Sequence, residues 1–212
     1  MINPQKLIDT INSSCKPLLG QSFALTKRKQ GNNFCLYRIN GTSDALNEFD
    51  NPADIVKVLK WFNDFWVFLE IKFTIEEKKV INKRTNEIYV CFSLSIFQGE
   101  NSDNKKYQLF RAEWDDYNNT EEKHSQPHWH ITSNQALEKT IEEYADIFDN
   151  RYLISLLDEE RNKVFDVKRI HFAMNGNWQN DETHIHKMEN EQQIAKWLQG
   201  MLNHLRIELD SQ

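Results

Sequence analysis

The segment Glu87–Gln98 constrains the fold of this chain more than any other. Side chains of a strand alternate between two faces, and here one alternating set is wholly apolar while the other mixes aromatic and small residues. The first set is Ile88, Val90, Phe92, Leu94 and Ile96, and the second is Tyr89, Cys91, Ser93, Ser95 and Phe97. This pattern predicts a strand in the centre of a sheet.

The neighbouring segments predict that this sheet is antiparallel. Residues 99–106 are polar and suit a hairpin loop, after which Tyr107–Asp116 returns as the next strand. Near the N-terminus, residues 22–29 and 34–39 flank the turn sequence Gly31-Asn32-Asn33, which predicts a second hairpin. Residues 41–50 are polar and predicted to be irregular, and residues 167–174 suit a further strand. Short connections of this kind predict an antiparallel meander and exclude a βαβ repeat.

Four segments carry helical signals. A first helix is predicted from Pro4, capped by Asn3 and ended by Pro17 and Gly20. Asn51-Pro52 and apolar residues at helical spacing predict a second helix near 52–70. Two more are predicted near 134–149 and 190–210. We therefore expect one α+β domain over residues 1–212, with an antiparallel sheet of about six strands, helices packed on one face and a docked C-terminal helix.

Composition narrows the class of protein. Hydrophobic residues make up 39% of the 212 residues, which is sufficient for a core. The net charge of −6 does not support nucleic-acid binding, although it leaves a local basic patch possible. The most apolar segment, residues 55–73, is interrupted by charged side chains and is too polar to span a bilayer, and no signal peptide is evident. We therefore expect a cytoplasmic protein without a membrane association.

Candidate site residues gather in the middle of the chain. His128 and His130 are two apart, so on a strand they share a face at a spacing of roughly 6.6 Å. Two neutral imidazoles from one strand can hold a metal ion when neighbouring strands supply the remaining ligands. We predict His128, His130 and His171 as metal ligands. The three cysteines are widely spaced, which argues against a thiolate zinc site.

The preceding predicted strand supplies charged partners for these histidines. Arg111, Glu113 and Asp115 alternate and therefore share one face. Either carboxylate could be a metal ligand or a general base, and the guanidinium could meet an anionic substrate. His124, His184 and His186 are more typical of surface histidines.

Two functions from different classes remain open. The first is a non-catalytic subunit of a larger assembly, which would bind a protein partner through its aromatic-rich helices. The alternative is a metal-dependent hydrolase acting on a phosphodiester or a similar substrate, with a divalent metal such as zinc or manganese.

Overall fold

The computed structural model describes residues 2–50, 52–80, 83–103, 106–116, 127–131, 188 and 190–210. Its elements in chain order are α1 Pro4–Leu19, β1 Leu25–Gln30, β2 Phe34–Ile39, β3 Ser43–Asn47, β4 Asp54–Phe62, β5 Phe65–Val80, β6 Lys83–Gln98, β7 Tyr107–Asp115, β8 His128–Ile131 and α4 Glu191–Asp210. The expected α+β class is confirmed, with strands dominating the described residues.

The strands form one eight-stranded sheet in which every pairing is antiparallel. Its main path runs β1-β2-β5-β6-β7-β8, and the β3–β4 hairpin joins it through β5. The expected number of about six strands was therefore too small. The antiparallel arrangement and the central position of β6 are confirmed, since β6 pairs with β5 along its whole length and with β7.

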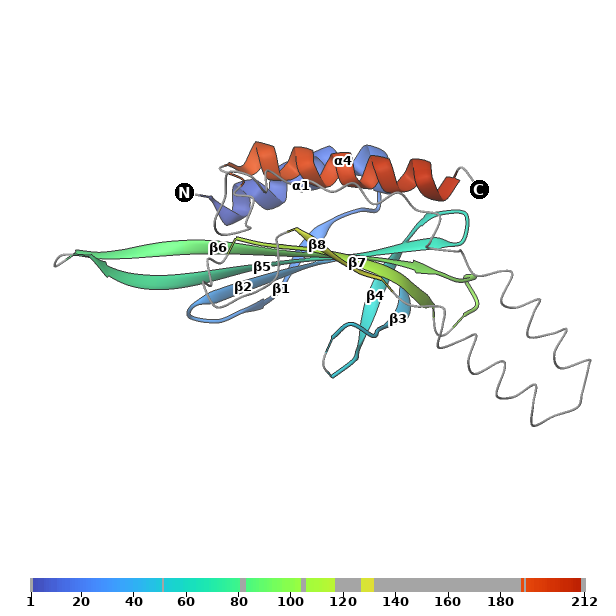
Figure 1. Cartoon of the computed structure of the whole chain (residues 1–212), viewed down its shortest axis with the longest axis horizontal. Coiled ribbons are helices and arrows are strands. Elements are labelled where there is room, and N and C mark those ends of the chain that lie inside the picture. Colours follow the sequence, from blue (N-terminus) through green and yellow to red (C-terminus); the bar gives the residue numbers. More distant parts are fainter. Residues whose placement is uncertain are drawn as a thin grey trace, which may run out of the picture.

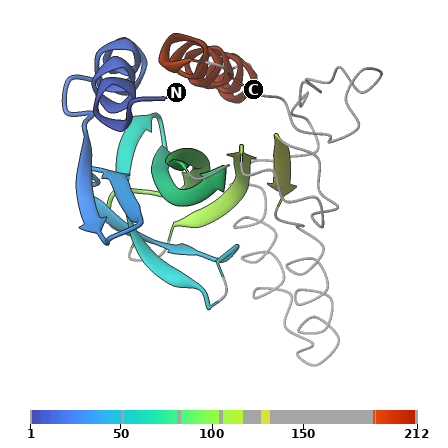
Figure 2. The ribbon, with the colours of Figure 1, turned by 90° about the vertical axis from the view of Figure 1, so that its left-hand side faces the viewer.

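The two described helices cover one face of the sheet. Figure 1 shows α1 and α4 on the same side of the sheet, and Figure 2 shows them side by side. Trp197 of α4 packs against Phe92 and Trp114, with ring centroids 6.3 Å and 6.4 Å away. The face beneath the helices is therefore the one that carries the large buried side chains of the central strands. These are Val67, Leu69, Ile71, Phe73, Val90, Phe92, Leu94 and Ile96.

The first and last helices agree with the sequence. The Asn3 side chain accepts a hydrogen bond from the Lys6 N–H at 3.1 Å and caps α1, which ends at Leu19 before Gly20. Pro17 lies inside the last turn of α1 and does not end it. In α4 one stripe is buried against the core, namely Ile194, Ala195, Leu198, Leu202, Leu205 and Leu209. Neither of the two described helices has the length and apolar content needed to cross a membrane.

The helix predicted near 52–70 is wrong, because these residues form β4 and the start of β5. Asn63 and Asp64 make a tight turn between the paired residues Phe62 and Phe65. Asn63 adopts φ 46°, a left-handed conformation that asparagine tolerates and that two-residue hairpins require. The apolar residues fitted helical spacing, but their β-branched and aromatic character favours strands.

The residues that we expected to be irregular, 41–50, contain strand β3. The β3–β4 hairpin lies on the side of the sheet away from the helices (Figure 1). A side chain at Gly41 would lie 2.3 Å from the Lys57 backbone, so only glycine allows the chain to approach β4 this closely. Lys106 immediately precedes β7. Its Nζ atom donates a hydrogen bond to Ser43 Oγ at 2.7 Å, which connects the β3–β4 hairpin to the start of β7.

The predicted helix near 134–149 and the predicted strand at 167–174 lie outside the described residues. The expectation of a single domain over residues 1–212 therefore stays a prediction.

Candidate metal centre

The pairing of β7 with β8 sets the geometry of the candidate site. Arg111 lies opposite His130 and Glu113 lies opposite His128, so all four side chains share one face of the sheet. This is the face away from α1 and α4, because the intervening Ala112 and Trp129 lie on the helix side. His128 directly opposes Glu113 and His130 is its diagonal neighbour, and both positions lie within reach of long side chains on an antiparallel pair, so the two histidines meet the one carboxylate.

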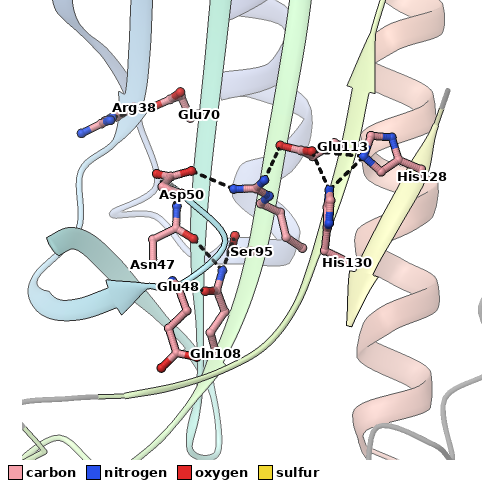
Figure 3. Close-up of polar contacts among 11 residues, drawn as sticks. Arg38, Asn47, Glu48, Asp50, Glu70, Ser95, Gln108, Glu113, His128 and His130 are labelled. Atoms are coloured by element: carbon pink, nitrogen blue, oxygen red, sulfur yellow. Dashed lines mark hydrogen bonds and ion pairs between the residues drawn. The ribbon is translucent and has the colours of Figure 1, made fainter. Parts of the chain in front are cut away.

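Three donor atoms from these residues converge. His130 Nε2 lies 2.9 Å from Glu113 Oε2, His128 Nε2 lies 3.2 Å from the same oxygen, and the two Nε2 atoms are 2.9 Å apart. Figure 3 shows both imidazoles directed at Glu113. Among the described residues, this is the one group of three histidine, cysteine or carboxylate side chains close enough to share a metal ion.

Hydrogen bonds alone do not satisfy this triangle. Each Nε2 atom carries either a hydrogen or a lone pair, and an ionised carboxylate oxygen only accepts. If both Nε2 atoms carry hydrogens, the two N–H groups crowd each other across 2.9 Å. If one or neither carries a hydrogen, at least one edge brings two lone pairs together. A cation at the centre removes the conflict, because all three atoms then donate a lone pair to it.

The second oxygen of Glu113 is held by Arg111. Arg111 Nη2 lies 3.0 Å from Glu113 Oε1, and Arg111 Nη1 donates to Asp50 Oδ1 at 2.8 Å. The arginine side chain is only 9% exposed, while its partners Glu113 and Asp50 are 22% and 39% exposed, so the pair with Glu113 is the more shielded from water. Arg111 therefore orients the carboxylate, leaving Oε2 for the histidines. The expected role of Arg111 in meeting an anionic substrate is untested, and both of its terminal nitrogens already have partners.

The surroundings of Glu113 favour its charged form. Burial by itself would raise the pKa of this carboxyl group, but the hydrogen bond with His128, the charge of Arg111 and the contact with His130 together lower it. Glu113 is therefore ionised and available as a metal ligand at neutral pH.

The loop after β3 covers the site. The buried Gln108 side chain donates to Asn47 Oδ1 at 2.8 Å and accepts from the Glu48 N–H at 2.7 Å. These bonds hold the loop so that the Phe49 ring lies 5.4 Å from the His130 ring and 5.5 Å from the Arg111 guanidinium. The loop thus supplies a carboxylate, Asp50, and an apolar cover.

The structure brings together four of the six site residues that the sequence predicts: Arg111, Glu113, His128 and His130. Asp115 lies on the same face but opposite Cys91, beyond the pair formed by Glu113 and His128, and does not belong to the three-residue cluster. His171 lies outside the described residues. Phe49 and Asp50 were not predicted as site residues, because residues 41–50 were expected to be irregular and nothing in their spacing indicates a contact with β7.

Comparison of the chain with protein-family models, with curated proteins and with solved structures finds no match in any of the three.

Proposed function

We propose that this protein is a metal-dependent hydrolase whose divalent cation is bound by Glu113, His128 and His130. The observation that supports this most directly is the triangle of donor atoms, with edges of 2.9–3.2 Å, which hydrogen bonds to an ionised carboxylate do not satisfy. Two imidazoles and one carboxylate are a donor set that zinc hydrolases and other divalent-metal enzymes use.

The dimensions of the triangle fit a metal ion. With metal–ligand bonds of about 2.1 Å, adjacent donors lie about 3.0 Å apart on an octahedral face and about 3.4 Å apart around a tetrahedral ion. The observed edges lie within or close to this range. The local charge also favours a bound cation, because Asp50 and Glu113 carry two negative charges and Arg111 carries only one positive charge. A divalent cation reverses this imbalance.

Three protein ligands leave at least one coordination position open. A water molecule bound there would lose a proton near neutral pH and become a nucleophile for an ester or phosphodiester bond. Arg111 would act as a positioning residue, because outer partners that orient a ligand tune both the affinity and the reactivity of the metal.

Metal content and hydrolysis measured on the same variants test this proposal. We expect protein dialysed against zinc or manganese to retain one ion per chain and to hydrolyse an activated ester or bis(p-nitrophenyl) phosphate. Glu113→Gln, His128→Ala and His130→Ala should each lose the ion and the activity together, since each removes a ligand.

A matched control is available on the same face. Glu70 pairs with Arg38 at 2.5 Å, as Glu113 pairs with Arg111, but Glu70 does not belong to the histidine cluster. Glu70→Gln should therefore retain both the metal and the activity. A wild-type protein that retains no metal after dialysis, or a Glu113→Gln variant that retains it, would contradict the metal site. Bound metal without hydrolysis of either class of ester would contradict the hydrolase assignment alone.

Three broader expectations belong with this proposal. The expected cytoplasmic location stays a prediction. We keep a protein partner as the second hypothesis, although one of the aromatic-rich helices that were to supply its docking surface, the one near 52–70, is a pair of strands with a largely buried set of aromatic rings. Nucleic acid stays disfavoured by the net charge of −6.

A further inference from the structure

A cavity of about 250 Å³ lies between β8 and α4. We call it the β8–α4 cavity, and it is lined by Ala112, Pro127, His128, Trp129, Lys196, Trp197, Gly200, Met201 and His204. Trp129 lies on the helix side of β8, whereas the carboxylate of the candidate metal centre lies on the other side of the sheet, and His128 is the one residue that belongs to both the cavity lining and the cluster. We propose that this cavity binds a small molecule that combines a flat apolar group of one or two rings with an anionic group.

The walls of the β8–α4 cavity suit a flat apolar group. Trp129 and Trp197 contribute indole rings, and Met201 adds a side chain that adapts to the shape of a ligand. Both indoles pack against other aromatic rings. Trp129 packs edge-to-face on Phe110, with ring centroids 5.8 Å apart, and Trp197 packs on Trp114, with centroids 6.4 Å apart. A cavity of about 150 Å³ accommodates benzene, so the larger β8–α4 cavity has room for one or two rings.

Gly200 keeps the α4 wall of the cavity open. It lies in the middle of α4, where glycine destabilises a helix relative to alanine. A Cβ atom at this position would meet no atom within 4 Å, so no neighbour requires the glycine. The consequence of having no side chain at this position is a wider cavity.

The polar side chains on the α4 wall of the cavity favour a ligand with a negative charge. Lys196 and His204 lie one helical turn before and one turn after Gly200, and therefore on the same side of α4. Lys196 is exposed, and no carboxylate in the described part of the chain forms a salt bridge with it. An acidic group on the ligand would pair with Lys196 while its rings lie between the indoles.

The binding test needs no metal, so its result is independent of the proposed hydrolase. Calorimetric titration should give saturable binding of 2-naphthoate at one site per chain. The neutral analogue 2-acetylnaphthalene should bind about two- to fivefold more weakly, as expected for one partly exposed ion pair. Lys196→Gln should remove this preference, and Gly200→Leu should weaken both ligands by about tenfold or more, because it fills the cavity.

Asn203→Leu is the matched control, since it adds the same side chain at an exposed position of α4 that does not line the cavity. It should bind both ligands as the wild type does. Gly200→Leu should fold, because leucine is a better helix former than glycine, and a cooperative melt verifies this. If it does not fold, Gly200→Ala must show a smaller loss of affinity in the same direction. The proposal is overturned by the absence of saturable binding, by affinity unchanged in the folded Gly200 variant, or by equal losses in the Asn203 variant.

Discussion

Arg111 shows how a single buried side chain organises the candidate metal centre. Its guanidinium bridges Asp50 of the loop after β3 and Glu113 of β7, and the Phe49 ring lies against it. A buried charge without partners strongly destabilises a protein, so the two carboxylates are part of what makes an arginine acceptable here. The same geometry directs one oxygen of Glu113 at His128 and His130. One residue thus connects the covering loop to the proposed metal ligands.

Arg111→Lys tests this positioning role without a change of net charge. A lysine ammonium is a point charge and cannot hold two carboxylates in the planar fork that arginine offers. We expect the affinity for the metal to fall by about tenfold to a hundredfold, as is usual when an outer partner of a ligand is altered. Competition with a chelating dye measures the affinity.

The control for this variant is Arg38→Lys, which alters the equivalent ion pair with Glu70 and should leave the metal affinity unchanged. Equal affinities in wild type and Arg111→Lys would show that Arg111 serves the fold alone.

At the scale of elements, the side-chain carboxylate of Glu191, at the start of α4, connects α4 to α1. Glu191 is the first residue of α4, and its oxygens accept from the Asn3 N–H at 2.9 Å and from Lys6 Nζ at 3.2 Å. The Glu191 side chain is 9% exposed, while that of Lys6 is 63% exposed. The hydrogen bond from the Asn3 backbone, the Glu191 backbone N–H and the contact with Lys6 lower the pKa of Glu191 below its usual value, although burial opposes this.

This lowered pKa predicts a pH-dependent stability. Because the pKa is lower in the folded state, the ionised carboxylate stabilises the protein at pH values above the unfolded pKa of about 4.3. The contribution is lost as the pH falls through the lower folded pKa. Glu191→Gln should therefore reduce the free energy of unfolding at pH 7 by about 1–2 kcal/mol, the difference between a charged and a neutral hydrogen bond.

Denaturant titrations at pH 7 and at strongly acidic pH measure this difference, which should shrink at the acidic pH. The exposed pair of Glu77 and Arg84 provides the comparison: Glu77→Gln should change stability by less than about 1 kcal/mol. A Glu191→Gln variant whose deficit is the same at both pH values would show that ionisation of Glu191 does not contribute.

For the whole molecule, the candidate metal centre joins parts of the chain that are far apart in sequence. The ligands come from β7 and β8, and the loop that follows β3 covers them. A metal that binds the folded state and not the unfolded chain stabilises this whole arrangement. At a free metal concentration of about a hundred times the dissociation constant, the gain is about 2.7 kcal/mol.

We therefore expect zinc or manganese to raise the melting temperature by about 5–10 °C for a chain of this size. The rise should diminish as the pH is lowered, because protons compete with the metal for the imidazoles and the carboxylate. Scanning calorimetry with and without a chelator measures the shift. Glu70→Gln should show the full shift and Glu113→Gln should show little of it, and an equal shift in both variants would indicate metal binding elsewhere.

The sequence by itself determined the elements whose local signals agree. Asn3 and Pro4 predict the start of α1, and the alternation in Glu87–Gln98 predicts the central strand. The apolar stripe within residues 190–210 predicts the C-terminal helix. It also predicted four of the residues at the candidate centre, because two-residue spacing places His128 with His130 and Arg111 with Glu113 on strand faces. These predictions depend on periodicities that a short segment expresses alone.

Only the tertiary structure decided the features that depend on pairing across the chain. Residues 52–70 fit both helical and strand patterns, and the pairing of β4 and β5 around Asn63 selects the strands. The register of β7 with β8 places Glu113 opposite His128 and diagonal to His130, and the loop between β3 and β4 brings Asp50 to Arg111. A contact between residues about sixty positions apart leaves no periodic trace in the sequence, because it arises from the packing of whole elements.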